Sequence, residues 1–95
     1  MTGPTGGEPD VPAFLHALGQ RVRLLRATRE LTQDQVAAAA GMSRSFVSLI
    51  EHGSHGVDVV RLLRLAAVFG LSLPELVDLP GTGTSDRDRS GPEVG

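Results

Sequence analysis

The sequence contains no cysteine, tryptophan or tyrosine among its 95 residues, and all nine of its basic residues are arginine. The absence of cysteine excludes disulfides, Cys–zinc sites and thiol chemistry, and a small fold without disulfides is expected in a reducing cytoplasm. No apolar run approaches the ~20 residues of a membrane span. The first ten residues lack the basic and apolar segments of a signal peptide. With only three phenylalanines, the core must be aliphatic.

Glycine and proline are concentrated at the two ends of the chain. Residues 1–9 contain three glycines and two prolines, and residues 81–95 contain four glycines and a single apolar side chain. Neither segment buries enough surface to offset its ordering entropy, so we expect two flexible tails around one domain at 10–80. The net charge is −2, but between residues 11 and 80 seven arginines outnumber six acidic residues. The acidity therefore belongs largely to the tails and does not exclude DNA binding.

Apolar periodicity and helix caps predict five helices and no strand. The first helix begins near Pro12, whose fixed φ suits a first turn. Each later helix follows a residue whose short polar side chain suits an N-cap: Thr32, Ser43, Asp58 and Ser72. Gly41 ends the second helix, and the fifth is expected to run to about Leu79. The predicted fold class is therefore all-α.

The second and third helices are short and are joined by a turn at Gly41. Two such helices around a glycine turn form a helix-turn-helix arrangement, with the second of them, about residues 43–51, as the recognition helix. Ala37 is small where the helices must cross, and Gly41 can take a positive φ. Val47 and Ile50, three residues apart, anchor the recognition helix to the core.

These positions match a known signature. Gln33, Ala37, Gly41, Val47 and Ile50 resemble the pattern of Cro/repressor-type helix-turn-helix proteins, the XRE family, and the resemblance covers about residues 18–79. LGQRVRLLRATRELTQDQVA is similar to their first two helices, GMSRSFVSLIEHG to their recognition helix and LLRLAAVFGLSLPEL to their last two. The resemblance implies a five-helix Cro/repressor-like domain. It also implies a transcriptional regulator that binds double-stranded DNA sequence-specifically as a homodimer on a two-fold operator, without a cofactor or metal.

A helical wheel with ~100° per residue identifies the outward face of the recognition helix. Ser45 and Leu49 lie opposite the two core anchors, Ser48 lies on the flank, and Arg44 is in the exposed first turn. The resemblance implies that these four residues contact bases in the major groove. Leu49 departs from the family, which commonly has a polar or basic side chain there.

The resemblance also implies that Gln33, which opens the second helix, contacts the DNA backbone. We further expect backbone contacts from Arg23, of the arginine cluster, and from Phe46 and His52. In the family, an arginine matching Arg26 pairs with a glutamate matching Glu51, which implies a structural ion pair here. The arginine cluster from Arg21 to Arg29 has a second interpretation as a solvated face.

Five apolar residues lie close together at the end of the domain: Leu71, Leu73, Leu76, Val77 and Leu79. The family commonly dimerises here, so we expect a dimer interface. Alternatively, Leu73 and Leu76 cover the core and only Leu79 is exposed. No paired acids, nucleophile–base set or phosphate loop is visible, which argues against an enzyme. The acidic total charge and Leu49 support a second hypothesis, a protein-interaction module for an antitoxin-type or sigma-factor partner.

Overall fold

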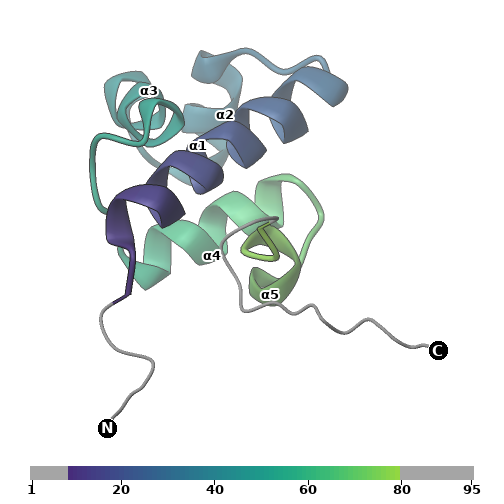
Figure 1. Ribbon diagram of the computed structural model, residues 1–95. Coiled ribbons are helices and arrows are strands. Elements are labelled where there is room, and N and C mark those ends of the chain that lie inside the picture. The colour runs from purple at the N-terminus through teal and green to yellow at the C-terminus, as the bar shows by residue number, and fades with distance from the viewer. Residues whose placement is uncertain (1–8, 80–95) are drawn as a thin grey trace, which may run out of the picture.

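The computed structural model describes residues 9–79 as five α-helices without a strand (Figure 1). They are α1 (Val11–Thr28), α2 (Gln33–Ala40), α3 (Arg44–His52), α4 (Val59–Val68) and α5 (Leu73–Leu76). The prediction of an all-α, five-helix domain is confirmed. The expected tails, 1–9 and 81–95, lie almost wholly outside the described residues. Within that described part, no helix has the length and apolar character needed to cross a membrane.

Local hydrogen bonds at the start of α2 and α3 explain where these helices begin. The Gln35 N–H donates to Thr32 Oγ1 at 3.0 Å, and the Thr32 N–H donates to Gln35 Oε1 at 2.8 Å, which closes a capping box. Ser43 Oγ accepts from the Phe46 N–H at 3.0 Å. Gly41 has φ +68°, so the turn uses the left-handed backbone that glycine adopts without strain.

The last helix is shorter than predicted. We expected it to reach about Leu79, but α5 ends at Leu76. Arg21 of α1 supplies the reason, because its Nε donates to the Leu76 carbonyl at 2.9 Å and its Nη2 to the Glu75 carbonyl at 2.8 Å. A side chain from another helix thus satisfies carbonyl groups that a helix end leaves unpaired.

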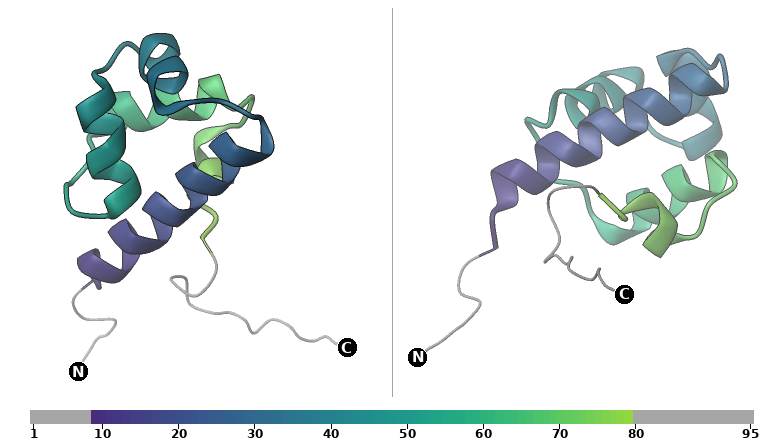
Figure 2. Two further views of the ribbon diagram at one scale, coloured as in Figure 1. Left: turned by 90° about the horizontal axis from the view of Figure 1, so that it is seen from above. Right: turned by 45° about the vertical axis from the view of Figure 1, so that its right-hand side comes forward.

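The core lies between the helices and is aliphatic apart from Phe69. α3 packs against α1 and α2, and α4 packs against α2 and α5. In Figure 1, α3 lies above α1, α2 passes behind α1, and α4 and α5 lie below it. Figure 2 shows from above that α3 runs beside α1. This arrangement leaves the other side of α3 at the surface.

Two glycines bring α1 into direct contact with the end of α3. A Cβ atom added at Gly19 would lie 2.5 Å from the Glu51 carbonyl oxygen and 2.6 Å from that of Ile50. At Gly53, which has φ +69°, an added Cβ would lie 2.9 Å from His16 Cα. Backbone therefore meets backbone at both points, and larger residues would push the two helices apart.

Candidate nucleic-acid interface

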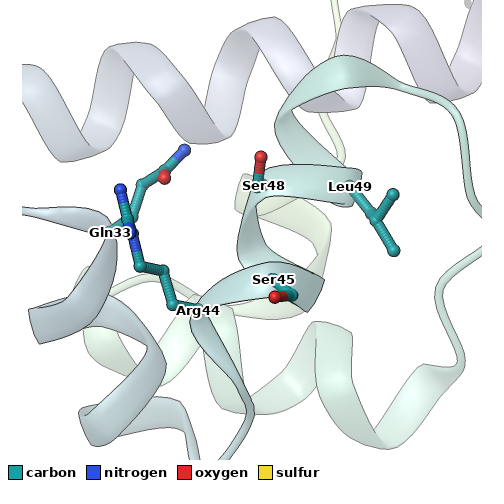
Figure 3. A pocket seen from close by; sticks show the side chains of 5 residues that line it. All are labelled: Gln33, Arg44, Ser45, Ser48 and Leu49. Atoms are coloured by element: carbon teal, nitrogen blue, oxygen red, sulfur yellow. The ribbon is translucent and has the colours of Figure 1, made fainter.

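The recognition helix α3 presents one face to the core and the opposite face to solvent. Val47 and Ile50 are buried, as the sequence predicts, and Leu49 keeps 39% of its surface exposed. The four predicted base-contact residues come together with one residue of α2 around an open hollow on the surface (Figure 3). Its lining residues are Gln33, Arg44, Ser45, Ser48 and Leu49.

Within this hollow the two ends differ in chemistry. Figure 3 shows Arg44 extending toward Gln33 at one end and Leu49 pointing away from both at the other. Arg44 has 66% of its side chain exposed, and its Nε lies 3.8 Å from Oδ1 of Asp34 on α2. The hollow therefore offers a cationic, hydrogen-bonding end and an apolar end, with small hydroxyl groups between them. Sequence reasoning did not single out Asp34.

Glu51, at the end of α3, is a buried carboxylate that joins three helices. Its side chain is 1% exposed and accepts two hydrogen bonds from Arg26, from Nε at 2.7 Å and from Nη2 at 3.0 Å. The Gln33 amide donates to Glu51 Oε1 at 3.1 Å. Burial alone would raise the pKa of Glu51, but these hydrogen bonds and the charges of Arg26 and Arg23 outweigh it and lower the pKa.

This arrangement changes the expectation for Gln33. The sequence indicated only that Gln33 opens the second helix and contacts the DNA backbone. The structure instead shows Gln33 partly buried and bonded to Glu51, with Arg26 on the other side of the same carboxylate. The side chain expected to bind phosphate is therefore already oriented by the protein.

The other predicted backbone contacts surround α3. Arg23 Nη2 donates to the Glu51 carbonyl at 3.4 Å, and His52 Nδ1 lies 2.7 Å from the Ser48 carbonyl oxygen. The Phe46 ring is partly exposed and lies beneath the guanidinium carbon of Arg61, 4.7 Å from the ring centroid. Contacts of these residues with DNA stay predictions. No group of three His, Cys, Asp or Glu residues suited to a metal occurs among residues 9–79.

The arginine cluster of α1 is not simply a solvated face. Arg21 binds the carbonyls of α5, and Arg29 Nη2 donates to the Phe69 carbonyl at 2.9 Å while its guanidinium stacks over the Phe69 ring. The nearby Arg26 also donates to the Leu31 carbonyl at 3.1 Å. These side chains tie helices together, which leaves Arg23 as the more exposed member near α3.

The five residues expected at a dimer interface divide into two groups. Leu76 and Leu79 are buried inside the single chain, with 0% and 6% of their surface exposed, so neither is available to a partner in this fold. The alternative is confirmed for Leu76, which covers the core, and is wrong for Leu79, which is buried as well. The remaining three are partly buried: Leu71, Leu73 and Val77.

Comparisons with known proteins match this geometry. A family described as "Helix-turn-helix domain" matches residues 17–79. The HTH-type transcriptional regulator y4dJ of Sinorhizobium fredii is 37% identical over 60 residues, which cover 63% of this chain and 78% of the relative. The restriction-modification controller protein C.AhdI of Aeromonas hydrophila is 38% identical with a TM-score of 0.65, covering 67% of this chain and 97% of that one. The biofilm regulator SinR, in complex with DNA, is 27% identical with a TM-score of 0.61, covering 64% and 98%.

Proposed function

Because this chain belongs to the helix-turn-helix family of Cro/repressor-type transcriptional regulators, we propose that it controls transcription by placing α3 in the major groove of duplex DNA. The observation that carries this proposal is the hollow between α2 and α3. It joins the outward side chains of α3 to Gln33 at the start of α2, so base contacts and a backbone contact belong to one rigid surface. Such a regulator works in the cytoplasm, where it meets the DNA.

Arg44 and Leu49 recognise different bases of the half-site. The planar fork of Arg44 matches O6 and N7 of guanine, the commonest specific contact in the major groove. Leu49 has no hydrogen-bonding group, so its favourable partner is the methyl group of thymine. Ser45 and Ser48 can donate or accept and therefore discriminate less. Together these residues favour a half-site with guanine under one end of α3 and thymine under the other.

Two copies on a two-fold operator complete the proposal. The half-sites would lie about one helical turn apart, roughly 34–36 Å, and the contact between the copies would use the partly buried Leu71, Leu73 and Val77. Leu73 lies in the first turn of α5, whereas Leu76 points into the core. Leu73→Glu should therefore weaken self-association while the chain stays folded, which sedimentation and far-UV circular dichroism would show together.

Selection of bound duplexes from a random library tests the function directly. We expect one enriched two-fold sequence, with affinity that falls steeply with salt at a log–log slope of about −0.9 per phosphate neutralised. Arg44→Ala should cost ~1–3 kcal/mol at one guanine and leave the other positions unchanged. Failure to enrich any duplex at low salt, with retention of a protein partner in a pull-down, would favour the protein-interaction module instead.

A further inference from the structure

Asp34 is an acidic side chain on a surface that is proposed to approach DNA phosphates, where its charge is unfavourable. It lies in the first turn of α2, and 75% of its side chain is exposed. It does not cap the helix, because Thr32 and Gln35 form the capping box. Its ion-pair partner is Arg44, the residue proposed to read guanine, across 3.8 Å from Nε to Oδ1.

The pair places Asp34 on one edge of the Arg44 guanidinium. A guanidinium carries five N–H groups in a planar fork: the Nε–H and one terminal N–H form its side edge, and the outer N–H groups of the two terminal nitrogens form its end edge. With Asp34 beside Nε, both terminal groups stay available for the O6 and N7 acceptors of guanine. A long, 66% exposed side chain otherwise loses rotamer freedom when it binds, and an ion pair that restricts it beforehand reduces that loss.

The backbone holds the two partners in register. Each lies in the first turn of its own helix, and the turn between those helices contains Gly41 in the left-handed conformation. Gln33, the neighbour of Asp34 in α2, is bonded to Glu51 of α3. The backbone that carries Asp34 is therefore held in place beside Arg44.

We propose that Asp34 is a specificity-determining residue that acts through Arg44, an inference that rests on the proposed function. Its negative charge lowers affinity for the phosphate backbone of every duplex. Its contact with Nε raises the preference of Arg44 for guanine. Asp34 therefore lowers affinity for all duplexes and raises the preference for guanine. Removing its charge should raise the affinity and lower the preference.

The test measures both quantities on Asp34→Asn. The probes are the duplex selected by the wild-type protein, the same duplex with each of the other three bases under Arg44, and a scrambled duplex of equal length. We expect the preference for guanine to fall about 1.5- to 5-fold, the range that an exposed ion pair supports. Affinity for the scrambled duplex should rise, with a steeper salt dependence.

Two further variants separate this role from general charge and from helix stability. Glu30 lines a second hollow together with Asp34 and Arg44, but it forms no ion pair with Arg44. Glu30→Gln therefore removes one negative charge near Arg44 and should raise affinity for DNA without changing base preference. In an Arg44→Ala background, Asp34→Asn should no longer change base preference, because the partner is gone.

The outcomes distinguish the inference from the function beneath it. If the wild-type protein selects no duplex, the proposed function fails. If Arg44→Ala loses the guanine preference and Asp34→Asn keeps it in full, only the role of Asp34 is overturned. If Asp34→Asn still changes base preference at any position in the Arg44→Ala background, the effect does not pass through Arg44 and belongs to the first turn of α2, where an acid also interacts with the helix dipole, and the proposal is likewise overturned.

Discussion

Replacement of Arg26 by methionine should reveal how much the domain depends on neutralising the Glu51 carboxylate. Methionine keeps the unbranched apolar stem and the helix propensity of the side chain but removes both hydrogen bonds to Glu51 and the one to the Leu31 carbonyl. Breaking one partner of a buried pair costs ~3–5 kcal/mol. We take about 3 kcal/mol, the lower end of that range, because Arg26 is 22% exposed and Arg23 still lies 3.8 Å from the carboxylate.

A loss of this size is large for a domain of about 70 residues, whose total stability is roughly 4–10 kcal/mol at 0.05–0.15 kcal/mol per residue. The midpoint of thermal unfolding should fall by more than ~10 °C, since 1 kcal/mol is worth about 4–8 °C in a domain this small. The chain has neither Trp nor Tyr, so urea and thermal unfolding are followed by far-UV circular dichroism.

The same variant should change how stability depends on pH. In the wild-type protein the pKa of Glu51 is lowered by folding. Its contribution to folding stability is therefore fully present above the pKa of the unfolded state and is lost as pH falls through the pKa of the folded state. In Arg26→Met, burial without the partner should raise the pKa of Glu51, so the variant gains stability as pH falls. The difference in unfolding free energy between the two proteins should therefore become smaller as pH falls from 7 to 4.

A matched double variant decides whether the unpaired charge of Glu51 is responsible for the stability lost in Arg26→Met. Arg26→Met with Glu51→Met should be more stable at pH 7 than Arg26→Met alone, although it changes one more core residue. The reasoning is refuted if the single variant loses less than ~1 kcal/mol at pH 7, or if its deficit is the same at pH 4.

Three further changes probe the interface and its support. Gln33→Ala should weaken binding to all duplexes alike in fluorescence anisotropy, because a phosphate contact positions the protein without reading the base sequence. It should also cost ~1 kcal/mol of stability in urea unfolding, because the hydrogen bond to Glu51 is lost. Leu49→Ala should remove a preference for thymine over uracil, and unchanged wild-type affinity for a uracil-substituted half-site would contradict this role. Gly19→Ala should cost ~1–3 kcal/mol in urea unfolding, while Gly56→Ala, with open space around it, should not show this overpacking cost.

The helix starts and the glycine turn could be predicted because their causes lie within a few residues. Thr32 and Gln35 cap each other across three positions, and Gly41 needs only its own backbone freedom. The alternation of core and solvent along α3 is likewise local, so the wheel placed Val47 and Leu49 on opposite sides of the helix. Signals of this kind establish the helices and the outward face of the recognition helix.

What could not be predicted depends on contacts between distant parts of the chain. The end of α5 is set by Arg21, more than fifty positions earlier, and no local pattern indicates that contact. Counting apolar residues left Leu76 either at a dimer interface or over the core, and how α5 packs against α4 decides for the core. The sequence analysis did not single out Asp34, because only the turn at Gly41 brings it beside Arg44.

The glycine contacts between α1 and α3 have a consequence for how DNA must behave. Since backbone meets backbone at Gly19 and Gly53, α3 cannot slide or rotate against α1 to follow an irregular groove. When α3 enters the groove, the two helices move as a single stiff body, and any misfit is relieved by the duplex. Operators whose base steps bend or twist easily should then bind better than stiff ones with identical contacted bases, so the protein would sense DNA flexibility at positions that no side chain touches.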